Sequence, residues 1–191
     1  MVTLCLVIGI IDCAYHDRFM AKKSDSFFLR QTVNIGQTNT FNEVALDLGA
    51  YVDALGKSVL RIHNIAVSFT DSAGKGLQIT TGDAAAAQYQ LTTQTQNDIV
   101  LSSNRSIVSS GKVYGVNLTN ASDFPNVSHD MDVLPQMWTN GYLIAVDTMY
   151  LGGQASTAWT EDVYASITLE CTVETMSEAA AMALALSQQG A

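Results

Sequence analysis

Charged residues are scarce in this sequence of 191 residues. Asp, Glu, Lys and Arg together make up 14% of it, whereas globular domains usually contain about a quarter. Hydrophobic residues reach 48%, enough to fill the core of one domain of sandwich or barrel size. The surface must then be covered largely by Thr, Ser, Asn and Gln. Such an exterior is typical of a protein that meets neighbours over much of its surface, and also of extracellular proteins.

Basic residues are especially few. The chain has nine Lys and Arg against eighteen Asp and Glu, for a net charge of −9. Nucleic-acid binding needs clustered cations that neutralise phosphates, so we do not expect strong nucleic-acid binding by the folded body. Several of the nine lie near the N-terminus, where Lys22, Lys23 and Arg30 are candidates to face a genome. The alternative is an ordinary solvated tail.

Cysteine and histidine are too few and too dispersed for the sites that they usually build. They are Cys5, Cys13, Cys171, His16, His63 and His129. The odd number of cysteines and the absence of a Cys-X-X-Cys pair argue against a disulfide framework and a zinc site. No histidine has the orienting partner that nucleophilic catalysis requires. The sequence therefore predicts neither an enzyme nor a bound cofactor.

A short acidic stretch is a weak indication of a metal site. Asp130 and Asp132 flank a methionine, and Asp123 lies nearby. Carboxylate oxygens are ligands that calcium prefers, but the spacing of an EF-hand is absent. Solvated loop acids are the favoured interpretation, and a calcium site is the alternative.

Long hydrophobic runs are missing, and residues 4–11 form the most continuous one. This run is too short to span a bilayer, and it lacks the positively charged lead of a secretory signal. Two interpretations stay open: a buried N-terminal strand, or a chain whose translation naturally begins at Met20. No other stretch of the sequence predicts a membrane span.

Alternation of apolar and polar residues dominates the rest of the chain and predicts strands. The clearest strands are residues 27–35, 41–48, 59–70, 141–151 and 163–173. The alternation changes phase near His63, which indicates a bulge. Residues 141–151 are apolar on both faces, as in a central strand covered on both sides. The Ala-rich residues 83–89 predict a short helical turn, and residues 117–138 predict a long irregular connection.

The periodicity changes near the C-terminus. Thr175 and Glu178 have the spacing of a capping box, and good helix formers follow, so we expect a terminal amphipathic helix. Met182 and Leu186 share one face of it. The helix either docks on its own domain or lies against a neighbouring subunit.

These patterns divide the chain into three parts. Residues 1–19 are an N-terminal extension, residues 20–174 a β-sandwich domain, and residues 175–191 the C-terminal helix. The predicted fold class is all-β, an antiparallel β-sandwich or jelly roll with a short C-terminal helix.

Three features of the layout point to one protein family. They are the basic lead at Lys22 and Lys23, the run of strands from Phe27 to Val173, and the long connection over residues 117–138. In these the chain resembles the single-jelly-roll coat proteins of icosahedral viruses. The resemblance implies a structural subunit of a virion that packs against copies of itself and other virion proteins. Many such proteins have a long Arg-rich arm, and its absence here argues against direct genome packaging.

For a shell subunit, four large apolar residues are the interface candidates. Met137 and Trp138 close the long connection, and Met182 and Leu186 lie on the terminal helix. Methionine and aromatic residues are enriched in interfaces. The alternative function is a secreted or cell-surface module for sugar binding or adhesion. Several glycosylation sequons favour this alternative, and the lack of disulfides argues against it.

Overall fold

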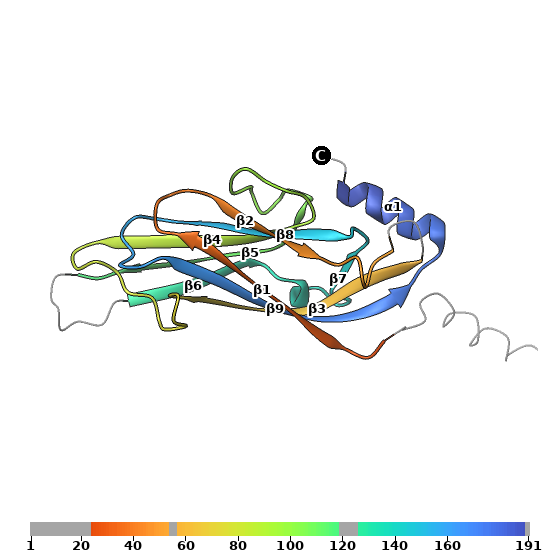
Figure 1. Ribbon diagram of the computed structural model, residues 1–191, viewed down its shortest axis with the longest axis horizontal. Coiled ribbons are helices and arrows are strands. Elements are labelled where there is room, and N and C mark those ends of the chain that lie inside the picture. The colour runs from red at the N-terminus through yellow and green to blue at the C-terminus, as the bar shows by residue number, and fades with distance from the viewer. Residues whose placement is uncertain (1–23, 54–56, 119–125, 190–191) are drawn as a thin grey trace, which may run out of the picture.

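The computed structural model describes residues 24–53, 57–118 and 126–189. In this part of the chain, two antiparallel sheets pack face to face, and a helix lies at one end (Figure 1). The first sheet has the strand order β1-β9-β3-β7, and the second sheet has the order β2-β8-β4-β5-β6. The elements are β1 Phe27–Gly36, β2 Asn42–Asp47, β3 Ser58–Thr70, β4 Ala84–Thr92, β5 Ile107–Val116, β6 Asn126–Val133, η1 Pro135–Met137, β7 Tyr142–Ile144, β8 Thr148–Ala155, β9 Val163–Thr175 and α1 Glu178–Gln189. The predicted extension over residues 1–19 lies outside the described residues.

Strands from the two ends of the chain pair with each other, from the outermost pair inward. β1 pairs with β9, β2 with β8 and β3 with β7, and β4 pairs with its successor β5. A long antiparallel hairpin rolled up on itself produces this order, which is that of a jelly roll. β6 adds an extra strand beside β5. The predicted antiparallel sandwich is thereby confirmed.

The apolar faces of the two sheets meet in one core. Along β9 the burial alternates, so that Ile167 and Leu169 point inward while their neighbours are partly exposed. From the second sheet, Tyr89 meets Phe69 edge to face at 5.8 Å between ring centroids. The Tyr89 hydroxyl shares a hydrogen bond of 2.7 Å with Ser109. Burial raises the pKa of Tyr89 to about 12, an effect that the bond to Ser109 opposes.

The helical turn predicted for residues 83–89 is wrong, because this stretch belongs to β4. Ala85 and Ala87 point into the core, while Ala84 and Ala86 point outward. β4 pairs with β5 on one side and with β8 on the other. Two flanking strands thus override the helix preference of alanine, which is a weak effect by comparison.

The single central strand predicted for residues 141–151 is two strands in different sheets. β7 lies in the first sheet and β8 in the second, and the chain crosses between them near Val146. Ala145 packs under α1, whereas Met149 and Leu151 belong to the main core. The stretch is apolar on both faces because successive parts of it are buried in different places.

Two further expectations need correction. Residues 117–138 are not irregular throughout, since they contain β6 and η1. The N-cap of α1 is Ser177 and not Thr175, because β9 continues through Thr175. The Ser177 hydroxyl accepts a hydrogen bond from the Ala180 N–H at 3.3 Å, as an N-cap side chain does.

Helix α1 lies at one end of the sandwich, beside β7 (Figure 1). Its small residues Ala181 and Ala185 pack against Val59 and Ala145. Small side chains on both partners let the helix approach closely. Among the described residues, no helix is long and apolar enough to cross a membrane.

Candidate assembly surface

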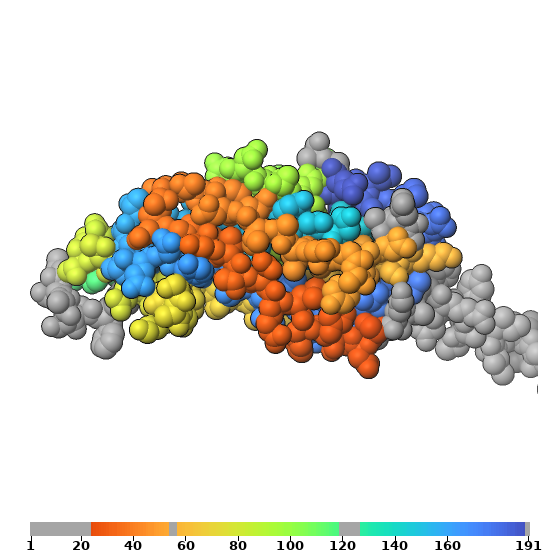
Figure 2. Space-filling model, in the orientation of Figure 1, coloured from red at the N-terminus to blue at the C-terminus, as the bar shows by residue number. Residues whose placement is uncertain are grey.

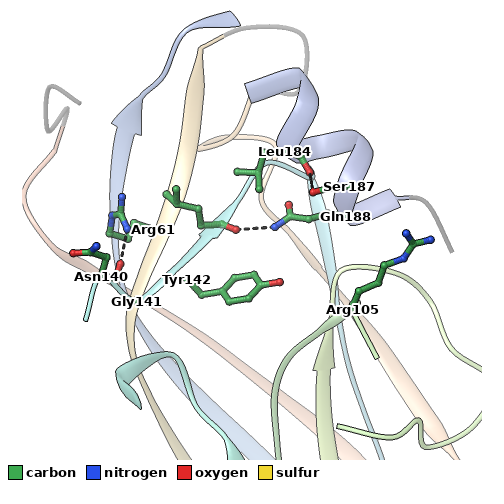
Figure 3. Close-up of a pocket in the computed structure, with 9 residues that line it drawn as sticks. Arg61, Arg105, Asn140, Gly141, Tyr142, Leu184, Ser187 and Gln188 are labelled. Atoms are coloured by element: carbon green, nitrogen blue, oxygen red, sulfur yellow. Dashed lines mark hydrogen bonds between the residues drawn. The ribbon is translucent and has the colours of Figure 1, made fainter. Parts of the chain in front are cut away.

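A hollow of about 770 Å³ lies where α1 meets the β7 edge of the first sheet. Tyr142 and Leu143 of β7 form its floor, and Leu184, Ser187 and Gln188 approach it from α1 (Figure 3). Arg61 and Arg105 lie on opposite sides of it. The shape of this end of the molecule therefore depends on how α1 is held against β7.

Gln188 fastens the end of α1 to the sheet edge. Its amide nitrogen donates to the Leu143 carbonyl at 2.7 Å, and its amide oxygen accepts from the Ala145 N–H at 2.9 Å (Figure 3). Its backbone carbonyl, at the C-terminal end of the helix, accepts hydrogen bonds from Thr93 Oγ1 and Gln94 Nε2 at 3.0 and 2.7 Å. Helix, first sheet and the loop after β4 are thus joined at one residue.

Arg61 forms the opposite wall and is held by a bidentate ion pair. Its Nε and one terminal nitrogen donate to the two oxygens of Glu174, at 2.7 and 2.8 Å. The side chains of Arg61 and Glu174 are only 10% and 12% exposed. The other terminal nitrogen of Arg61 donates to the Asn140 carbonyl (Figure 3). Arg61 therefore connects β9 and β3 to the turn that precedes β7.

The turn before β7 is a rigid support. Gln136 of η1 accepts from the Ile65 N–H at 3.1 Å and donates to the Ile65 carbonyl at 3.0 Å. Gly141, at the other end of the turn, has φ +63° and lies so close to the Ile62 carbonyl that a Cβ atom would clash with it. Both contacts are made with β3 near its bulge at His63.

Two of the interface candidates are displayed on this support. Met137 and Trp138 are each 55% exposed. Their backbone is fixed by the contacts of Gln136 and Gly141, so the two apolar side chains project from a well-ordered turn. We call Met137 and Trp138 together the η1 platform.

The other two candidates lie on the outward face of α1. Met182 and Leu186 are exposed, because the helix turns Ala181 and Ala185 toward the sheet. Both interpretations of the helix had been left open, and the structure shows it docked on its own domain. Its larger apolar side chains are nevertheless directed away from that domain.

The acidic candidates form an ion pair with a lysine. Asp130 and Asp132 lie on β6, and their oxygens are 3.9 and 3.2 Å from Lys112 Nζ on β5. The hydrogen bond that Lys112 donates to Asp132 raises the pKa of Lys112. Asp123 lies outside the described residues, within which no group of His, Cys, Asp and Glu is arranged to hold a metal ion.

The described histidines and the buried cysteine are structural. His63, at the bulge, shares a hydrogen bond of 3.0 Å with Thr172. His129 lies on β6 and meets the Phe69 ring edge to face. Burial, with a smaller contribution from Glu170, raises the pKa of Cys171 to about 12, so its thiol stays protonated near neutral pH.

Of the genome-facing candidates, Arg30 alone lies within the described residues. It is exposed on β1, with its guanidinium carbon 5.8 Å from the centre of the Phe28 ring. Lys22 and Lys23 lie outside the described part of the chain.

This surface is also shaped by three residues that are not among the candidates predicted from the sequence, Gln136, Gln188 and Gly141. Gln136 directly follows Pro135, and Gln188 is a polar residue on the buried face of a helix. A polar position in phase with Ala181 and Ala185 is a signal that can be found from the sequence. The partner of Gln188 on β7 cannot be found in this way.

No protein-family model and no curated protein matches this sequence. Among solved structures, the chain is similar to Merkel cell polyomavirus VP1, in a structure described as an unassembled pentamer. The TM-score is 0.38 and the identity 8%, over 81% of this chain and 98% of that one. So loose a superposition assigns no function.

Proposed function

We propose that this chain is a structural subunit that assembles with copies of itself into a protein shell of the viral capsid type. The observation that carries the proposal is the η1 platform, in which Met137 and Trp138 are exposed on a backbone pinned by Gln136 and Gly141. Exposed aromatic and methionine side chains cost little to bury against a partner when their support is already ordered.

The terminal helix supports the same proposal. Met182 and Leu186 project from a helix whose own docking is completed by small residues and Gln188. Single exposed apolar residues are common on monomers, but here two pairs of large ones occupy firmly held elements. Together with the low charge of the chain, they suit a surface that neighbours cover.

The jelly-roll order is compatible with this role, since it occurs in capsid proteins as well as in lectins and cupins. In the proposed shell, residues 20–174 form the body and residues 175–191 an appended helix. Lys22, Lys23 and Arg30 would face the genome. Because Arg30 is exposed on the outer face of the first sheet, the proposal would turn that face toward the interior of the virion.

Particle size tests the proposal. Purified full-length protein should give closed particles, or rings of a few subunits, in negative-stain microscopy and multi-angle light scattering. Rings form when identical subunits repeat one head-to-tail contact whose rotation closes. Molecules of monomer mass at every concentration and ionic strength would contradict it and favour the secreted or cell-surface module.

A further inference from the structure

The outer face of the second sheet has two adjoining hollows, of about 240 and 200 Å³. Gln88 and Lys112 line both of them. Strand pairing aligns Gln154, Gln88, Lys112 and Asp130 in one row across four strands. The first hollow reaches Tyr114, and the second reaches Ser110. We call this continuous surface the outer groove.

The groove exists because small side chains form part of its floor and hydrogen bonds fix one of its walls. Ala84 and Ala86 are the outward residues at the start of β4, so no large side chain rises there. One wall is formed by residues 99–102, and it is fastened by Gln90. The Gln90 amide donates to the Asp98 carbonyl at 3.1 Å, and its oxygen accepts from the Val100 N–H at 2.9 Å. In Figure 2 the loop that follows β4 rises as the green bump beside the blue helix.

The environment of Ser110 indicates that the outer groove binds a ligand. This residue is 8% exposed, it lines the smaller hollow, and its hydroxyl has no hydrogen-bond partner among the described residues. A buried hydroxyl without a partner is unfavourable, and such groups commonly mark a site that something else completes. β6 also has a bulge opposite Ser110 and Gly111, and bulges are frequent beside functional sites.

The chemistry of the groove is that of a site for a neutral polyol. Lys112 brings one positive charge, and Asp130 and Asp132 beside it bring two negative ones, so the groove does not favour anions. Side-chain amides, a hydroxyl and the ion pair offer both donors and acceptors, as a sugar requires. Tyr114 is 45% exposed and presents a ring on which the C–H face of a pyranose can stack. Each hollow is smaller than the roughly 300–1,000 Å³ of drug-sized pockets, which suits one sugar ring.

We infer that the outer groove binds a neutral carbohydrate of at least two rings, with Ser110 and Gln88 hydrogen-bonding the hydroxyl groups of the ring in the smaller hollow and Tyr114 stacking on the ring in the larger one. This inference does not depend on assembly. A monomer that binds sugar at the outer groove would contradict the proposed shell and support this inference. A shell that binds no sugar would support the proposed shell and contradict this inference.

Full-length protein is titrated with neutral disaccharides built from glucose, galactose, mannose and N-acetylglucosamine, and binding is followed by saturation-transfer NMR and calorimetry. At least one of these should bind saturably, with a dissociation constant on the order of 1 mM, as expected for a small polar ligand. Sodium sulfate should not compete. The same disaccharides displayed on an immobilised glycan array test whether the groove prefers a surface-bound glycan to a free sugar.

Three variants locate the site, and a fourth, Met137→Ser, is the control. Tyr114→Ala and Gln88→Ala should each weaken binding by about tenfold or more, and Met137→Ser should leave it unchanged. Ser110→Ala should weaken binding while leaving the melting temperature unchanged or raising it, because it removes a hydroxyl that has no partner in the free protein. The inference is overturned if no neutral sugar binds, if Tyr114→Ala and Gln88→Ala have no effect, or if Ser110→Ala only lowers the melting temperature.

Discussion

Gln188 and Ala145 are 43 residues apart in the chain and meet in a hydrogen bond of 2.9 Å from the Ala145 N–H to the Gln188 amide oxygen. Together with the bond from Gln188 to Leu143, it continues the ladder of the first sheet where β7 ends. Gln136 does the same for Ile65, on the part of β3 that β7 does not reach. Proteins often protect sheet edges with charged residues; this chain, which is poor in charge, uses neutral amides.

Replacing Gln188 by alanine should lower the free energy of unfolding by roughly 1–3 kcal/mol, because the buried Ala145 N–H loses its partner. Urea unfolding followed by circular dichroism measures this change. Gln189→Ala is the matched control, since Gln189 is the next residue and is exposed. Equal effects of the two substitutions would show that Gln188 does not fasten the helix.

Gly141→Ala should destabilise the protein more than Gly74→Ala. Both glycines have positive φ, +63° and +77°, so alanine meets a similar backbone penalty at either position. A Cβ at Gly74 meets nothing within 4 Å, whereas at Gly141 it would clash with the Ile62 carbonyl. The free energy of unfolding should fall by about 1–3 kcal/mol more in Gly141→Ala than in Gly74→Ala, which is the usual cost of overpacking. Urea unfolding of both variants measures this difference, and equal losses would mean that the turn before β7 is free to move away from β3.

The ion pair of Arg61 and Glu174 should behave differently from that of Lys112 and Asp132. Arg61→Ala leaves the Glu174 carboxylate in a mostly buried position and should cost about 3–5 kcal/mol. Lys112→Ala removes an exposed pair that solvent screens, and it should lower stability far less. Thermal or urea unfolding compares the two, and a double Arg61→Ala, Glu174→Ala variant should lose less than the sum of the single losses. Additive losses would contradict a direct coupling.

Stability should fall at alkaline pH. The folded pKa of Tyr89 is raised from 10.0 to about 12, so the folded state holds this proton more tightly than the unfolded chain. Its stabilising effect is complete below pH 10 and is lost as the pH rises toward 12, a change of up to about 2–3 kcal/mol. Cys171, raised from 9.0 to about 12, acts in the same direction from pH 9 upward.

Urea unfolding at intervals between pH 8 and pH 11 measures this dependence. Tyr89→Phe should flatten the part of the curve above pH 10, and Cys171→Ala should flatten the part that begins near pH 9. Curves with the same slope as the unsubstituted protein would show that neither group is responsible.

Much of the fold could be predicted from the sequence, because a strand with one buried face must alternate. The alternation of buried and partly exposed residues in β9 is complete from Val163 to Cys171, and a change of phase in the sequence predicts the bulge at His63. β4 was missed because alanine is small enough to occupy either face and favours helices in isolation. The division between β7 and β8 was missed because burial on both faces looks the same whether one strand is covered twice or two strands lie in different sheets.

The candidate surface was only half predictable. The sequence shows large apolar residues in the long connection and on the terminal helix, and all four are exposed, namely Met137, Trp138, Met182 and Leu186. The contacts that hold these residues in place cannot be predicted from their neighbours in the sequence, because Gln136 and Ile65 are separated by 71 residues. The outer groove likewise depends on side chains from several strands that only the fold brings together.

Sedimentation velocity of the full-length protein over about a hundredfold range of concentration tests the proposed assembly most directly. The unsubstituted chain should sediment as rings or closed particles. The double variant Met137→Ser, Trp138→Ser should shift toward the monomer, while Leu101→Ser, which removes a still more exposed apolar side chain, should assemble as before. A chain that sediments as a monomer throughout, or a double variant that assembles as well as the unsubstituted protein, would contradict the proposal that the η1 platform holds subunits together.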